Sequence, residues 1–117
     1  GTLFVRRCEA GRVVLGDREL TRSFLLAVDR VVEDWPVATI EALDEARVDD
    51  VLALQPELVL LGTGLRQRFP TAAILARFLT RGVGVEVMDN AAAARTFNVL
   101  AAEGRRAVAA FMLPPPA

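Results

Sequence analysis

The sequence predicts a domain of the α/β class, and three observations lead to this prediction. Its 117 residues fit one domain, and 53% of them are hydrophobic, which is enough for a substantial core. Between Leu58 and Leu113 the pattern alternates strand, helix, strand, helix and strand, as in sheets with parallel strands. The run Leu58–Leu61 is apolar throughout, as expected of a strand covered on both faces.

Short strands separated by turn residues fill the first part of the chain. Residues 3–7 and 12–15 are typical of a β-hairpin with Ala10-Gly11 in its turn. A further short strand is expected to open at Glu19, and Phe24 to Val28 forms another candidate strand. We therefore predict a β-rich N-terminal region built on a hairpin.

Two lone side chains near this region have predicted packing roles. Trp35 is the only tryptophan and is expected to close one end of the core rather than to bind a ligand. Cys8 is the only cysteine, so no disulfide can form within the chain. Its β-rich surroundings favour a quiet, half-buried thiol, and the single cysteine favours a reducing, cytoplasmic location.

Three helices are predicted in the second part of the chain, each preceded by a side chain that can cap its first turn. They cover about residues 45–54, 71–81 and 91–103, and the caps are Asp44, Thr71 and Asp89-Asn90. The expected inward faces of the last two are Ile74, Leu75, Phe78 and Leu79, and Ala93, Phe97, Leu100 and Ala101. Strands at 83–88 and 106–113 complete the alternation.

The main spatial prediction concerns the ends of two strands. If residues 58–61 and 83–87 form neighbouring parallel strands, their carboxyl ends meet at one edge of the sheet. Gly62-Thr63-Gly64 then lies beside Met88-Asp89-Asn90. Functional loops of open α/β sheets usually lie at this edge.

Absent residue types exclude several kinds of chemistry. The chain has no histidine, tyrosine or lysine and one cysteine. Ser-His-Asp and Cys-His catalysis, His- or Cys-rich zinc sites, Schiff bases and Walker-type lysines are therefore excluded. We expect no metal and no cofactor.

The charge balance gives a second set of exclusions. All 14 basic residues are arginines, and 15 acidic residues bring the net charge to −1. We therefore expect no binding to nucleic acid, and no apolar run reaches the ~20 residues of a transmembrane helix. Arginine in place of lysine, with abundant alanine, suggests a GC-rich bacterial genome. The oligomeric state is not defined by the sequence.

Polar residues around the predicted junction form a candidate binding site. Glycine loops and helix starts offer free N–H groups that suit anions, and arginines bind carboxylates or phosphates in a bidentate manner. The candidate residues are Gly62, Thr63, Gly64, Asp89, Arg95, Thr96, Asn98, Glu103 and Arg105. The structural alternative is that Asp89 is an ordinary helix cap and that Gly-Thr-Gly is only a tight turn.

The motifs LVLLGTGL at residues 58–65 and VEVMDNAAAARTFNVLAAEGR at residues 85–105 carry a family resemblance. With Ser23–Leu26 and Trp35, they resemble a family of unknown function that includes a mitochondrial complex I assembly factor and an adipogenesis-associated protein. The resemblance implies a small three-layer α/β domain with a mixed central sheet of about five strands. Asn90 and Ala94 depart from the threonine and cysteine that are common in that family.

Three hypotheses about function follow. The first is a binding or assembly-accessory protein without catalysis, which holds a protein partner or a small anionic ligand at the candidate site. The second is an enzyme with Asp89 or Glu103 as general base, assisted by Thr63 or Thr96; it requires both carboxylates in one pocket. The third gives the whole motif a purely structural role.

Overall fold

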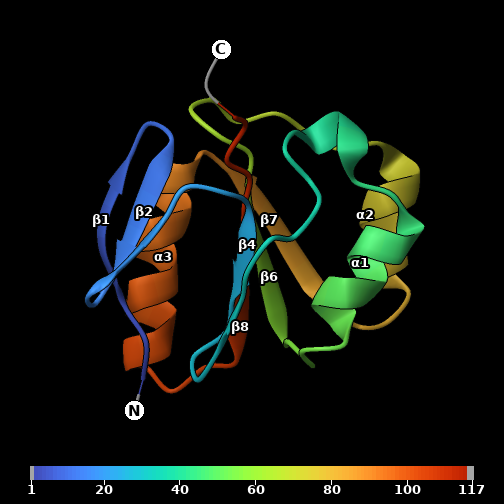
Figure 1. Cartoon of the computed structure of the whole chain (residues 1–117). Coiled ribbons are helices and arrows are strands. Elements are labelled where there is room, and N and C mark those ends of the chain that lie inside the picture. The colour runs from blue at the N-terminus through green and yellow to red at the C-terminus, as the bar shows by residue number, and fades with distance from the viewer. Residues whose placement is uncertain (1, 116–117) are drawn as a thin grey trace.

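The computed structural model describes residues 2–115 and confirms the α/β class with a mixed five-stranded sheet. The central sheet has the order β5-β4-β8-β6-β7 (Figure 1). Its strands are β4 (Phe24–Leu26), β5 (Val31–Val32), β6 (Leu58–Gly62), β7 (Gly84–Met88) and β8 (Ala107–Phe111). Strand β6 runs parallel to both β7 and β8, whereas β4 is antiparallel to β5 and β8.

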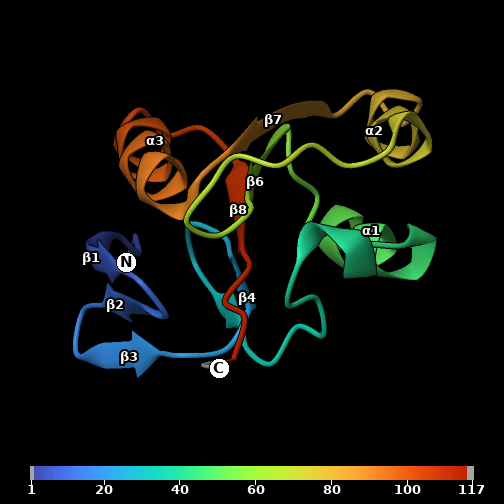
Figure 2. The same cartoon turned by 90° about the horizontal axis from the view of Figure 1, so that it is seen from above.

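Two layers cover this sheet. On one face lie α3 (Asn90–Ala102) and a small antiparallel sheet of β1 (Val5–Glu9), β2 (Arg12–Leu15) and β3 (Arg18–Leu20). On the other face lie α1 (Glu45–Leu52), α2 (Ala72–Leu79) and the short 3-10 helix η1 (Ile40–Ala42). Figure 2 shows the sheet between these two layers, which confirms the expected three-layer arrangement.

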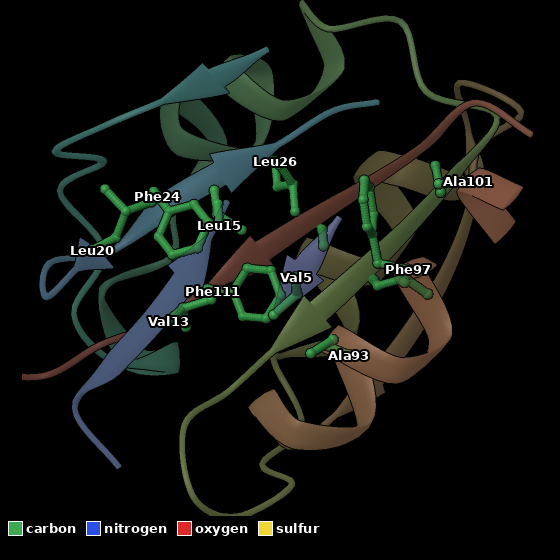
Figure 3. Close-up of a cluster of buried hydrophobic side chains, with 14 of the residues drawn as sticks. Val5, Val13, Leu15, Leu20, Phe24, Leu26, Ala93, Phe97, Ala101 and Phe111 are labelled. Carbon is green, nitrogen blue, oxygen red and sulfur yellow. The ribbon is translucent and has the colours of Figure 1, made fainter. Parts of the chain in front are cut away.

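Each face of the sheet has its own hydrophobic core. Figure 3 shows the core on the α3 face, where Phe24 and Phe111 stack with ring centroids 4.9 Å apart. The predicted inward residues of α3 are all buried here. The other core holds Trp35, which is 3% exposed, together with Val48 and Phe78. Trp35 therefore packs, as predicted.

The helix caps are confirmed as well. The side chains of Asp44, Thr71 and Asp89 each accept a hydrogen bond from the backbone N–H three residues later. Such caps satisfy backbone donors that have no partner within the helix. A single polar residue at each N-cap position therefore predicted the start of each helix.

Several expectations need correction. The further short strand expected at Glu19 is confirmed as β3, which joins the hairpin in one sheet, whereas β5 at residues 31–32 and η1 at residues 40–42 were not predicted. Helix α2 ends at Leu79 rather than at residue 81, because Thr80 already forms its C-cap. Leu79 is 62% exposed and does not belong to the buried stripe.

Candidate functional site

The two loops predicted to meet do meet. In the parallel β6–β7 pair, Gly62 lies opposite Met88, and the Thr63 N–H donates to the Met88 carbonyl at 2.9 Å. The Asn90 N–H then donates to the Gly64 carbonyl at 2.8 Å. The Gly-Thr-Gly loop and the start of α3 therefore form one continuous structure, which we call the rim.

Asn90 holds the rim to the last strand. Its side chain is 6% exposed, and Oδ1 accepts a hydrogen bond from the Gly64 N–H at 3.1 Å. Its Nδ2 donates to the Met112 carbonyl at 3.0 Å, and the Met112 N–H donates to the Gly62 carbonyl at 3.0 Å. One buried amide thus joins the loop after β6, the start of α3 and the chain after β8.

The two glycines of the loop are required for different reasons. A Cβ atom at Gly62 would lie 2.6 Å from Asn90 Oδ1 and 2.9 Å from the Ala110 carbonyl oxygen, so no side chain fits. Gly64 has a φ of +101°, which residues with a side chain rarely adopt. The close approach predicted for this loop is therefore made by the protein's own asparagine.

Thr63 is a structural residue of the same loop. Its hydroxyl donates to the Arg66 carbonyl at 2.6 Å and accepts from the Arg68 N–H at 3.0 Å. The side chain is 8% exposed. Thr63 thus shapes the turn after the rim, and its hydroxyl faces its own loop.

A cavity of about 430 Å³ opens beside the rim. Its walls come from the rim, the β1–β2 turn and the chain after β8. The lining residues are Cys8, Glu9, Ala10, Gly11, Gly64, Leu65, Asp89, Asn90, Ala91, Met112, Leu113 and Pro114. Most of these are apolar, and Leu65 at its edge is 77% exposed. The cavity therefore suits an apolar group better than a highly charged one.

The charged groups near the cavity do not form a nucleophile and base pair. The Asp89 carboxylate accepts the Ala92 N–H at 2.8 Å and so serves as a helix cap. Burial raises the pKa of the Cys8 thiol, and the nearby Asp89 charge raises it further, against an opposing effect of Arg95. A thiol with a raised pKa is a poorer nucleophile at neutral pH. Cys8 is half-buried, as predicted, and we still expect its thiol to be unreactive.

The remaining candidate residues do not join the rim. Asn98 is used by the fold, since its side chain pairs with both backbone groups of Val5 at 2.8 and 2.9 Å. Arg95 is exposed and lines a separate depression of about 290 Å³ between α3 and β1. Thr96 is half-buried on the same helix.

Glu103 and Arg105 lie at the opposite end of α3. Asp89 caps the start of this helix and Glu103 its end, so they are separated by roughly 20 Å at 1.5 Å per residue. Arg105 lies 3.7 Å from Glu57, which precedes β6. The two carboxylates of the enzyme hypothesis therefore do not share a pocket, and that pairing was wrong.

Sequence reasoning missed two contributions to this site. Asn90 was placed at the helix start, but its buried bridge to Met112 was not foreseen; an amide between the Asp89 cap and a run of alanines was the available signal. The β1–β2 turn forms one wall of the cavity. That contact depends on how the small sheet docks on α3, which no local pattern encodes.

Within residues 2–115 we find no group of three or more Cys, Asp or Glu side chains arranged to hold a metal ion. In that same part of the chain, no helix combines the length and apolar character needed to cross a bilayer.

Fold and site together define a small α/β domain with a buried polar junction beside an apolar cavity. The sequence profile of the family described as "Protein of unknown function (DUF498/DUF598)" matches residues 5–112, and the chain belongs to this family. This result confirms the resemblance drawn from the motifs around residues 58–65 and 85–105.

Three relatives illustrate the range of the family. A Xanthomonas campestris protein solved by NMR is 48% identical, with a TM-score of 0.88 over 97% of this chain and 86% of that one. A Francisella tularensis protein named "13 kDa major membrane protein" is 29% identical over 88% of this chain and 85% of its own length. Human NADH dehydrogenase [ubiquinone] 1 alpha subcomplex assembly factor 3 is 32% identical over 92% of this chain, which spans 65% of that protein.

Proposed function

We propose that this protein is an accessory or assembly protein without catalysis of its own, and that it binds a protein partner at the cavity beside the rim. The observation that carries the proposal is the apolar cavity bordered by Leu65, a leucine that is 77% exposed. Exposed apolar surface around a concave site is typical of protein interaction sites. The human relative named as an assembly factor supports the same role.

The chemistry of the cavity also indicates what the partner presents. Ala10, Ala91, Met112 and Leu113 offer an apolar floor, and the Asp89 carboxylate lies among the lining groups. We infer that the partner inserts an apolar side chain with a basic residue beside it. A small anionic ligand is the weaker alternative, because the Asp89 charge opposes it and Asp89 already takes the Ala92 N–H.

The structural hypothesis explains part of the motif, and the two proposals are compatible. Gly62, Asn90 and Asn98 have internal roles that need no ligand. They keep the cavity wall rigid, and a rigid wall lowers the entropy cost of binding. We further propose a cytoplasmic location, supported by the single cysteine.

The test is capture of partners from the source organism with tagged protein. Leu65→Asp places a charge at the cavity edge, and Ala91→Trp fills the cavity from the exposed first turn of α3. Val99→Asp is the matched control, because Val99 is 57% exposed on α3 and does not line the cavity. We expect both cavity variants to lose the captured partner at least tenfold while the control retains it.

Capture of the same partner in equal amounts by all three variants would contradict the proposal. Thermal melts of the three variants are needed alongside, since Leu65 and Val99 are both exposed and neither change should unfold the domain.

A further inference from the structure

The central sheet has an open edge at β7. This strand pairs with β6 on one side, and in the part of the chain that the structure describes it has no neighbour on the other. Two bonds fix which residues face β6. The Gly84 N–H donates to the Glu57 carbonyl at 3.4 Å, and the Met88 carbonyl accepts from the Thr63 N–H at 2.9 Å. Gly84 and Met88 therefore turn their backbone groups inward.

Alternate residues of the strand turn the other way. In a parallel pair only every second residue bonds to a given neighbour, so Val85 and Val87 direct their N–H and C=O groups outward. The Gln67 side chain confirms this direction, because its Nε2 donates to the Val87 carbonyl at 2.8 Å. Within residues 2–115, the other outward groups, both groups of Val85 and the Val87 N–H, have no partner.

The surface on the α2 side of this edge is apolar. Arg77 points to α1, where it binds Asp49. Leu75 and Leu79 are each two residues away, about 200° around the helix, and so face away from α1. Leu79 is 62% exposed. Figure 2 shows β7 beside α2, at the edge of the sheet farthest from β4.

The surface on the α3 side of the edge carries a charge. Glu86 lies between the two outward-facing valines and is exposed. Within the residues that the structure describes, no arginine forms an ion pair with it. Successive side chains of a strand point to opposite faces of the sheet. Glu86 would therefore contact side chains on one face of an added strand, and the two valines would contact side chains on its other face.

We propose that the β7 edge binds an extended segment of a protein partner, with an arginine or lysine opposite Glu86 and apolar residues on both sides of it. The backbone of the segment would pair with Val85 and Val87, which is the established manner of strand addition. Its apolar side chains would lie beside Leu79, and its basic side chain would lie across from Glu86.

The charge of Glu86 favours a basic segment of a partner over a second copy of this chain at the β7 edge. An antiparallel pair of β7 strands can satisfy the three unpartnered outward groups of each copy only if Val85 of one copy lies opposite Val87 of the other. The two-fold axis then passes between the Glu86 residues of the two copies and places their carboxylates directly opposite each other. Like charges in this position destabilise a strand pair, whereas a basic residue stabilises it. The proposal does not depend on the cavity beside the rim.

The test uses a synthetic peptide and the full chain labelled with ¹⁵N. The probe is acetyl-Thr-Val-Arg-Val-Thr-amide. One control has glutamate in place of the arginine, and a second has N-methyl groups on both valines, which prevents backbone pairing. We expect the arginine peptide to shift the amide signals of Val85 and Val87 and to slow their hydrogen exchange. We expect it to bind about fivefold more tightly than the glutamate peptide.

Variants of the protein make the test specific. Glu86→Arg should reverse the preference between the two peptides. Val87→Pro removes one outward N–H, which proline tolerates on an edge strand, and should abolish binding while the melt of the protein stays close to that of the parent. These results together would support the proposal.

Other results would overturn it. Any one of three results suffices: no amide shifts with the arginine peptide, equal binding of the N-methylated peptide, or amide shifts confined to the cavity residues. A dimer in solution that Val87→Pro dissociates would show instead that a second copy occupies the edge.

Discussion

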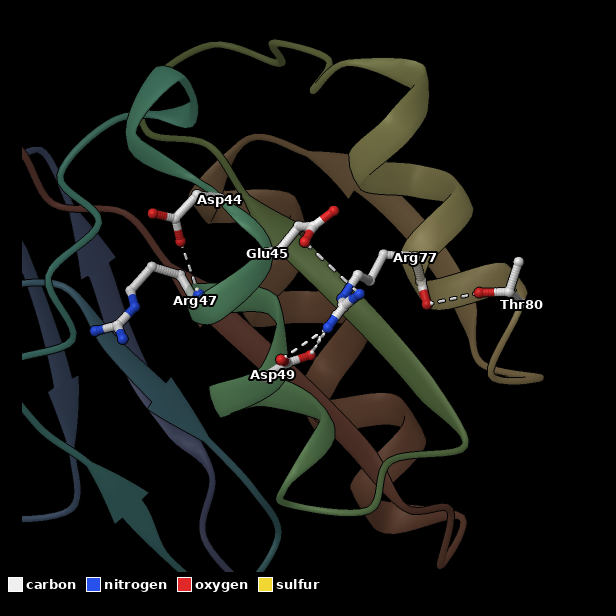
Figure 4. A network of polar contacts seen from close by, with 6 residues as sticks. All are labelled: Asp44, Glu45, Arg47, Asp49, Arg77 and Thr80. Carbon is white, nitrogen blue, oxygen red and sulfur yellow. Dashed lines mark hydrogen bonds and ion pairs between the residues drawn. The ribbon is translucent and has the colours of Figure 1, made fainter.

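The rim and the contact between α1 and α2 hold the fold together in contrasting ways. At the rim, the neutral amide of Asn90 is 6% exposed and binds two buried backbone groups. Between α1 and α2, Arg77 reaches Asp49 at 2.9 to 3.2 Å and Glu45 at 3.8 Å, with side chains that remain in contact with water (Figure 4). The charged network makes more contacts, but water competes for all of them.

The difference teaches where substitutions should matter. A buried backbone group that loses its partner cannot turn to water, so its full desolvation cost is felt. An exposed ion pair loses little, because both charges are solvated again. We therefore expect the single amide of Asn90 to outweigh the whole Arg77 network, and the following predictions test this order.

The largest effect is expected for Asn90→Ala. It leaves the Gly64 N–H and the Met112 carbonyl without partners in a buried position, at a cost of about 2–4 kcal/mol in the free energy of unfolding. Urea unfolding measures this loss. Asn90→Thr, the residue that the family resemblance leads us to expect there, keeps one hydroxyl for these groups and should recover part of the lost stability. Equal stability of Asn90→Ala and the parent would contradict the assigned role.

Gly62→Ala should follow, with a loss of about 1–3 kcal/mol. The new methyl group would meet Asn90 Oδ1 at 2.6 Å and the Ala110 carbonyl at 2.9 Å, and the backbone oxygen cannot move aside easily. Gly84→Ala is the closer control, since its φ is not positive and a Cβ there would closely approach only the end of the flexible Leu58 side chain, at 3.2 Å. A Gly62→Ala protein as stable as the parent would show that the rim can relax around the methyl group.

A smaller and more local effect is expected for Asn98→Ala. The change removes two hydrogen bonds to Val5 at the partly buried contact between α3 and β1, worth about 1–2 kcal/mol. Amide hydrogen exchange should accelerate in β1 and leave β6 and β7 unchanged. Thr96→Ala, on the same helix, is the control. Faster exchange throughout the central sheet would contradict a local role.

The smallest effect is expected for Arg77→Ala. The hydrogen bond from Arg77 holds the pKa of Asp49 below its usual value and raises the pKa of Arg77. Because the pKa of Asp49 is lower in the folded state, the pair stabilises the protein above the unfolded pKa, which is about 4. That contribution is lost as the pH falls through the lower folded pKa. The parent and Arg77→Ala should therefore differ slightly in urea midpoint at pH 7, less at high salt, and progressively less as the pH falls below about 4.

Much of the fold and of the rim could be predicted from the sequence, because the features concerned depend on local patterns. The three helix caps, the parallel β6–β7 pair and the meeting of residues 62–64 with 88–90 follow from short-range patterns and from the geometry of parallel sheets. The two glycines predicted the loop, because residues with a side chain do not fit at these two positions.

The rest depended on contacts between distant segments. The bond from Asn90 to Met112 joins residues 22 positions apart, and that from Asn98 to Val5 joins residues 93 apart. A helix face shows which residues are neighbours, but not which segment lies against it. For this reason Arg95, Asn98 and Arg105 were grouped with the rim in the prediction, although the structure places Arg95 and Asn98 in the middle of α3 and Arg105 beyond its end.

The central claim, that the rim is where this protein meets its partner, is tested most directly by site-specific photo-crosslinking in the source organism. A benzoylphenylalanine residue is placed at Leu65, beside the cavity, and in a second protein at Glu45, in the α1–α2 network. Both side chains are well exposed, so both probes sample the surroundings equally. We predict a discrete covalent adduct with one protein from position 65 and none from position 45. An adduct from position 45 alone would contradict the claim.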